Sequence, residues 1–130
     1  MNNRKELSVA DIVSMSLIYT AIDTSISLCD GADDEYAEEM TEELTKMYKL
    51  LASAVTLKDG TSPKDWYYSY AECDFTFSFD EANDLADMIE DFKVKYEEID
   101  TELSRPITEA LASTQVEIAM DCLLSSLVEL

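Results

Sequence analysis

The sequence predicts an all-α, single-domain helical bundle over residues 1–130, with four long helices, a short helix and an extended aromatic connector. Three observations lead to this prediction. The 130 residues are enough for one hydrophobic core. Two glycines and two prolines leave few places for tight turns, which disfavours a many-stranded β fold. Apolar residues recur at three- and four-residue steps, as on one face of an α-helix.

The first two predicted helices occupy most of the N-terminal half. The first begins after the N-cap Ser8, with Asp11 in its first turn. It carries little charge, so we expect it at the centre of the bundle or at an interface. Asp33 or Asp34 can cap the second helix, which we expect to end at Gly60. The expected core positions of the two helices are Ile12, Met15, Tyr19, Ile22, Ile26 and Cys29, widened by Val13, Leu17 and Leu28, and then Tyr36, Met40, Leu44, Met47, Leu51 and Val55.

An aromatic segment follows. Ser62 and Pro63 are typical of a helix start, so a short helix is predicted over 63–72, with Trp66 on its inner face. The segment DFTFSF then alternates apolar and polar residues, as a strand does, but one short strand has no obvious partner elsewhere in the chain. We therefore expect an extended connector whose phenylalanines fill the bundle.

Two further long helices complete the prediction. Ser78 and Glu81 have the spacing of a capping box and begin the third, which stops before Pro106. The fourth is expected from Pro106 to the C-terminus. Because it is lightly charged, it could, like the first helix, form a homodimer face. The expected core positions are Leu85, Met88, Ile89, Phe92, Tyr96 and Ile99, and then Leu111, Ile118, Cys122, Leu123, Leu127 and Leu130.

The charge restricts the class of partner. Asp and Glu total 29 against 9 Lys and Arg, a net charge of -20. Like-charge repulsion disfavours direct binding to nucleic acid or to an anionic membrane, and the charge favours a basic partner. The alternative is that it serves solubility or adaptation to high salt.

The residues that usually carry chemistry are scarce. There is no His, and Cys29, Cys73 and Cys122 lie far apart. No phosphate-binding loop, dinucleotide fingerprint, HExxH or EF-hand spacing occurs. We therefore predict no catalytic residue, no metal and no cofactor. The sequence shows no secretory signal and no uncharged apolar run long enough to cross a membrane, so we expect a cytoplasmic protein, in the host cytoplasm if the chain is phage-encoded.

One pattern implies an enzyme. The segment EEMTE, with Glu38, Glu39 and Glu42, resembles the first half of the EExxE plus ExxD magnesium motif of the all-α MazG-type nucleotide pyrophosphohydrolases. The resemblance implies a shared Mg²⁺, with the second half of the motif at residues 81–84 or 97–100. Both segments lie further along the chain than the helix pair of that family allows, and the basic residues that a triphosphate site needs are lacking.

Aspartates form the main candidate binding surface. Asp80, Asp84, Asp87 and Asp91 fall at four-, three- and four-residue steps, which places them about 4.5–6 Å apart along one helix face. That spacing is on the scale of phosphates along a nucleic-acid strand. Acids of the second helix could form a parallel row, and the alternative is a solvated face. The candidate acidic surface comprises Glu35, Glu38, Glu39, Glu42, Asp80, Asp84, Asp87, Glu90 and Asp91.

Two main functional hypotheses follow. The first is a non-enzymatic inhibitor that mimics nucleic-acid charge and occupies the basic groove of a DNA- or RNA-binding protein, as phage and mobile-element proteins do against restriction or CRISPR systems. The second is an immunity protein or acidic chaperone that neutralises a basic toxin or effector, with Trp66, Tyr67 and Tyr70 as candidate interface aromatics. For these aromatics the alternative is a place in the core. An acidic assembly component is a third hypothesis, and the pyrophosphohydrolase is a fourth.

Overall fold

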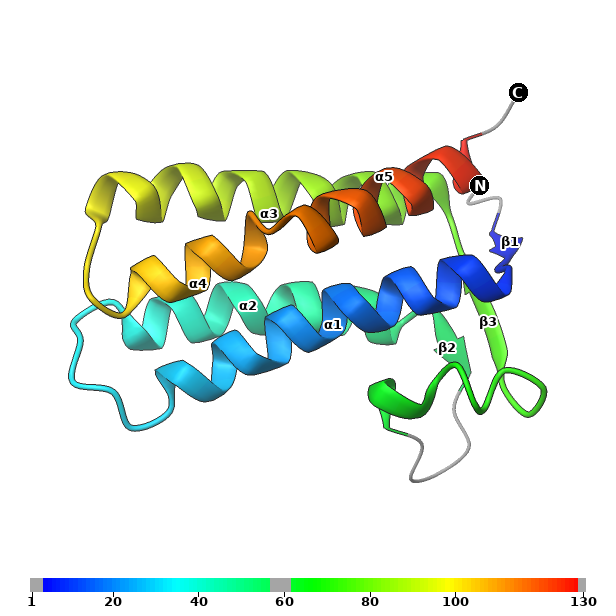
Figure 1. Ribbon diagram of the computed structural model, residues 1–130, viewed down its shortest axis with the longest axis horizontal. Helices are drawn as coiled ribbons and strands as arrows, with labels where there is room; N and C mark the ends of the chain where they lie inside the picture. The colour runs from blue at the N-terminus through cyan, green and yellow to red at the C-terminus, as the bar shows by residue number, and fades with distance from the viewer. Residues whose placement is uncertain (1–3, 57–61, 129–130) are drawn as a thin grey trace.

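Helices build the fold, as the sequence predicts. The computed structural model describes residues 4–56 and 62–128, and within these residues five α-helices pack together (Figure 1). The fold class is therefore all-α. The helices are α1 (Val9–Cys29), α2 (Ala37–Ala52), α3 (Phe79–Ile99), α4 (Ser104–Leu111) and α5 (Thr114–Leu127).

The five helices fill the four positions of a bundle. Helix α1 packs against α2 on one side and against α4 and α5 on the other, and α3 packs against α2, α4 and α5. Helices α4 and α5 follow each other along one edge and together take the fourth position (Figure 1). The pair α2–α3 and the pair α1–α5 consequently form opposite faces of the bundle.

The predicted continuous last helix is wrong, because it breaks after Leu111. Helix α4 starts before Pro106, which stands in the first turn, where a missing N–H is tolerated. After the break Ser113 caps α5, and its Oγ accepts a hydrogen bond of 3.3 Å from Val116 N. The break changes the helical phase, so Ile118 is exposed rather than buried. The expected core position Leu130 lies outside the described residues.

The aromatic segment does have strand partners. Strand β3 (Asp74–Phe77) lies between β1 (Lys5–Glu6) and β2 (Val55–Thr56) in an antiparallel sheet of order β1-β3-β2. The prediction of an unpaired connector is therefore wrong, although Phe75 and Phe77 are buried as expected. Helix α2 ends at Ala52 because the chain turns into β2, so it does not continue towards Gly60, which lies outside the described residues.

The predicted helix starts are confirmed for α1 and α3. Ser8 with Asp11, and Ser78 with Glu81, form complete capping boxes. The start of α2 differs in detail, because Tyr36 occupies the cap position while Asp34 Oδ1 accepts a hydrogen bond of 2.8 Å from Tyr36 N. The short helix predicted over 63–72 shrinks to one 3-10 turn, η1 (Pro63–Asp65), followed by turns.

The core contains most of the expected apolar residues, with one group of corrections on α1. Trp66 is 1% exposed and packs between Tyr19 and Phe75, with ring centroids 5.7 Å and 6.1 Å away. On α1, by contrast, Val13, Leu17 and Leu28 are each more than a third exposed, because only one side of this helix meets the bundle. By length and composition α1 could also cross a membrane, but here it packs against α2, α4 and α5.

Candidate functional site

The aspartate stripe lies fully on the surface of α3. Asp80, Asp84, Asp87 and Asp91 are all exposed, and Glu90 is exposed beside them. The capping box that begins α3 anchors the helix just before the first of these aspartates. Among the described residues no salt bridge engages any of the four, so their charges are available to a partner.

The acids of α2 do not run beside this stripe. Glu35, Glu38, Glu39 and Glu42 are exposed, as expected. Helices α2 and α3 are antiparallel, however, so the first half of α2 lies beside the last half of α3 (Figure 1). The parallel row of carboxylates is therefore not formed, and the two acidic groups occupy opposite ends of the α2–α3 face.

Lysines from each helix lie opposite the acids of the other. The Lys95 ammonium on α3 is 2.8 Å from Glu39 Oε1 and 3.3 Å from Glu43 Oε1 on α2. At the other end, Lys46 and Lys49 of α2 line a shallow groove together with three aspartates of the stripe, Asp84, Asp87 and Asp91. Lys46 and Lys49 form no salt bridge within the described residues, so they reduce the local negative potential without neutralising any one carboxylate.

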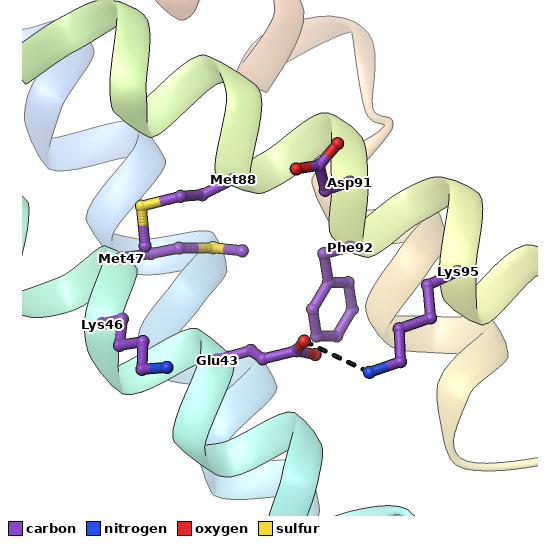
Figure 2. Close-up of a pocket in the computed structure, with 7 residues that line it drawn as sticks. All are labelled: Glu43, Lys46, Met47, Met88, Asp91, Phe92 and Lys95. Carbon is purple, nitrogen blue, oxygen red and sulfur yellow. Dashed lines mark hydrogen bonds and ion pairs between the residues drawn. The ribbon is translucent and has the colours of Figure 1, made fainter.

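A pocket of about 220 Å³ lies between α2 and α3 next to the stripe. Figure 2 shows its apolar wall, made by Met47, Met88 and Phe92, and the Glu43–Lys95 ion pair at its edge. Asp91 belongs both to this pocket and to the groove, so the two are continuous. Residues 43, 47, 88 and 95 were not predicted as site residues, because their proximity depends on how α2 and α3 pack.

The ion pair of Lys95 with Glu39 shifts the pKa of both groups. Its hydrogen bond to Glu39 lowers the pKa of that carboxyl below its ordinary value and raises the pKa of the Lys95 ammonium. Burial, together with the neighbouring Glu43 charge, raises the pKa of the Tyr96 phenol. The Tyr96 hydroxyl and Glu43 Oε2 are both buried, and neither has a hydrogen-bond partner among the described residues.

The magnesium motif is not assembled. Glu39 is paired with Lys95, and Glu81 is held by the Ser78 cap and by Arg4 Nη2 at 3.2 Å. Asp100 is paired with Arg105 at 2.7 Å. Within the described part of the chain no three Asp, Glu or Cys side chains gather where they could hold a metal ion. The resemblance to pyrophosphohydrolases therefore gains no geometric support.

The aromatic candidates separate into core and surface. Trp66 is buried, which favours its alternative place in the core over the interface, and its indole Nε1 has no hydrogen-bond partner among the described residues. Tyr67 and Tyr70 are exposed by 49% and 40%. Tyr68, which was not predicted as a site residue, is exposed by 82%. Its position two residues after the buried Trp66 is the available signal, but the sequence predicts a helix where the structure has turns.

Comparisons with known proteins do not identify the function of this site, so it is interpreted from its own residues. No protein-family model matches the sequence, and searches of the curated proteins and of the solved structures found no match. What the geometry provides is a row of unpaired carboxylates on a rigid helix, a groove and pocket beside it, and a separate exposed tyrosine cluster of Tyr67, Tyr68 and Tyr70.

Proposed function

We propose that this protein binds a basic protein through its α2–α3 face and acts by occupying that partner's nucleic-acid site. The observation that carries the proposal is the row of four exposed, unpaired aspartates on α3. Like charges one turn apart repel each other, and Asp is a poor helix former. A helix that keeps four of them in line, with none in a salt bridge among the described residues, bears a cost for which partner binding provides a reason.

The proposed mechanism is occupancy. Carboxylates about 4.5–6 Å apart along the axis would take the places of successive phosphates in a groove lined by Lys and Arg. The net charge of -20 would accelerate the encounter with a basic surface, and this attraction would weaken as salt is added. No bond is made or broken, so the protein would work as a stoichiometric inhibitor in the cytoplasm, of the kind that phages and mobile elements use.

The lysines beside the stripe would add selectivity. Lys46 and Lys49 line the groove opposite Asp84, Asp87 and Asp91. A uniformly basic surface would be repelled by these two cations while being attracted by the aspartates. A partner with an acidic or neutral residue in the matching place would avoid that repulsion. The proposed partner is therefore one with a shaped basic groove, and a simple polycation should bind less well than its charge suggests.

The decisive experiment removes the stripe charge without changing the fold. The variant Asp84→Asn, Asp87→Asn, Asp91→Asn loses three charges on α3. Its control, Glu109→Gln, Glu117→Gln, Asp121→Asn, loses three charges from exposed sites on α4 and α5. Each protein is immobilised and exposed to an extract of the source cell, and bound proteins are identified by mass spectrometry. A synthetic DNA duplex is then tested as a competitor.

The outcomes separate the proposal from a merely solvated acidic surface. We expect wild type and control to retain a nucleic-acid-binding protein that moderate salt or the duplex displaces, and the stripe variant to lose it. Capture that survives neutralisation of the stripe contradicts the proposal, as does a captured partner that the duplex cannot displace. If the wild-type eluate contains no basic protein, the proposal is contradicted, and solubility is then the role of the charge.

The exposed tyrosine cluster supports a second candidate, an immunity protein or acidic chaperone that neutralises a basic toxin. Tyrosines offer a large contact area with few rotatable bonds, and Tyr68 is the most exposed of the large apolar side chains described. The double variant Tyr67→Ala, Tyr68→Ala tests this candidate in the same assay. Capture that resists high salt, fails in this variant and persists in the stripe variant would favour it over the charge mimic.

A further inference from the structure

Six of the ten exposed large apolar side chains of the described chain belong to the face formed by α1 and α5. Among large apolar side chains outside the tyrosine cluster, Val9, Val13, Leu17, Leu28, Ile118 and Val128 are exposed by 37% to 63%, and all lie on or directly after these two helices. Only Val94 of α3 is comparable elsewhere in the described residues. A contiguous apolar face on a small protein usually marks an interaction site.

The α1 stripe follows helical geometry. Val9, Val13 and Leu17 stand four residues apart, and Leu28 lies three turns beyond Leu17 on the same side. The exposed residues between them are small or neutral: Ala10, Thr20, Thr24 and Ser27. Asp23 is the one exposed charge described on α1, and it lies one turn after Tyr19, whose ring packs against Tyr48 of α2. That charge therefore sits at the α2 edge, away from α5.

Helix α5 continues this neutral face. The Ser126 hydroxyl bonds Asp11 of α1, so the side of α5 that carries Ser126 borders α1. Cys122 and Ile118 lie one and two turns back on that same side. The acids of α5, Glu117 and Asp121, instead line a groove with α3. The surface shared by α1 and α5 is thus apolar and almost uncharged in a protein of net charge -20.

We propose that a second copy of this chain covers the α1–α5 face, giving a two-fold homodimer. The net charge of the chain determines where a second copy can bind, and it favours the α1–α5 face. Two copies repel strongly, so they can approach only where neither presents carboxylates, and a two-fold contact pairs the same neutral face with itself. The α2–α3 face is on the other side of the bundle, so the dimer would display two acidic faces outward. The dimer itself does not depend on the proposed function.

The size of the α1–α5 face determines how tightly the dimer is expected to associate. Helix α1 has 21 residues and α5 has 14, so the face is about 31 Å long along α1 and about 21 Å along α5. Together they offer roughly 500 Å² per copy, less than the ~800 Å² per partner of a standard stable interface. We therefore expect a weak dimer, with a Kd of roughly micromolar magnitude or above.

Salt should act on this dimer in the opposite sense to its action on partner binding. Raising NaCl from about 0.1 M to about 1 M shortens the screening length from about 10 Å to about 3 Å. The repulsion between two acidic copies then falls while apolar contact persists, so dimerisation should tighten. Binding to a basic partner should weaken over the same range. The opposite salt dependences therefore distinguish a failure of the dimer proposal from a failure of the proposed function.

Sedimentation equilibrium of the full chain at several concentrations and both salt levels is the test. The variants Leu17→Glu and Ile118→Glu each place a charge on the face, and Val94→Glu places the same charge at an apolar, 58% exposed site on α3. We expect the two face variants to weaken dimerisation by roughly tenfold or more. The Val94 control should behave as wild type. All three positions are exposed, and circular dichroism checks that each variant folds.

Three results would overturn the dimer. The first is a wild-type chain that stays monomeric at about 1 M NaCl throughout the micromolar range. The second is a dimer that both face variants leave intact, or that Val94→Glu weakens equally. The third is a monomer that instead binds vesicles of neutral phosphatidylcholine and loses that binding in Leu17→Glu, which would make the face a lipid contact.

Discussion

The Ser126 hydroxyl near the end of α5 donates a hydrogen bond of 2.8 Å to Asp11 Oδ2 in the first turn of α1. The same oxygen accepts hydrogen bonds from the backbone N and the Oγ of Ser8, at 3.1 Å and 2.8 Å. Asp11 is only 2% exposed, and no Lys or Arg of the described chain forms a salt bridge with it. One buried carboxylate thus caps α1 and ties the last helix to the first.

This arrangement predicts that removing the Ser126 hydroxyl lowers the stability of the fold. Ser126→Ala leaves the buried Asp11 carboxylate with one donor fewer, so it should lower the free energy of unfolding by about 1–2 kcal/mol in urea titrations near neutral pH. Asp11→Ala removes both the Asp11 half of the capping box and this tie, and should lower it further, by about 2–3 kcal/mol. The exposed neighbour Ser125→Ala is the control, and an equal effect of the two serine variants would contradict the prediction.

Local patterns were predictable from the sequence, and contacts between distant segments were not. The N-cap at Ser8 and the capping box at Ser78 depend on residues only three positions apart, so both helix starts are predictable, although the structure shows that Ser8 and Asp11 also form a complete capping box. Strands β1 and β2 have two residues each, too short for a pattern, and they meet β3 from distant parts of the chain. The break at Ser113 was missed because Ala, Ser and Thr are all compatible with a continuing helix.

The candidate site also combines features that the sequence predicts with features that depend on how distant segments pack. Exposure of the aspartate stripe follows from helical spacing within α3 alone, and the structure has it as predicted. The offset between the acids of α2 and α3, and the pairing of Lys95 with Glu39 across 56 residues, depend on the antiparallel packing of the two helices. For Trp66, Tyr67 and Tyr70 the sequence leaves both core and interface open, because aromatic content alone does not distinguish a core side chain from an exposed one; the structure buries only Trp66 of the three.

Trp66 and Tyr68 should respond very differently to truncation. Trp66→Ala opens a cavity beside Tyr19 and Phe75 and should lower the free energy of unfolding by about 3–5 kcal/mol. Tyr68→Ala removes an exposed ring and should change it by less than about 0.5 kcal/mol. Thermal unfolding followed by circular dichroism measures both. A Trp66→Ala protein as stable as Tyr68→Ala would show that the indole does not pack in the core.

The Glu39–Lys95 pair predicts a defined pH dependence. Because Lys95 lowers the pKa of Glu39, the pair stabilises the fold above the ordinary carboxyl value of 4.5, and this contribution is lost as the pH falls through the lowered pKa. In Lys95→Met the pKa of Glu39 should return towards 4.5, which carboxyl NMR titration measures. The stability difference between wild type and variant should shrink in acid. Lys49→Met, which removes an unpaired lysine, should leave the Glu39 titration unchanged.

Neutralising the aspartate stripe should make the fold more stable while it abolishes partner binding. Asp80–Asp84 and Asp87–Asp91 are like-charge pairs four residues apart on α3, and such pairs destabilise a helix by about 0.2–0.5 kcal/mol each. In Asp84→Asn, Asp87→Asn, Asp91→Asn this repulsion disappears, and Asn is no better a helix former than Asp, so a gain would come from charge alone. Urea titrations at low and high salt should show a gain at low salt that fades as salt screens the repulsion. A loss of stability instead would mean that Lys46 and Lys49 across the groove attract the stripe more strongly than its members repel one another, and that the aspartates serve the fold rather than a partner.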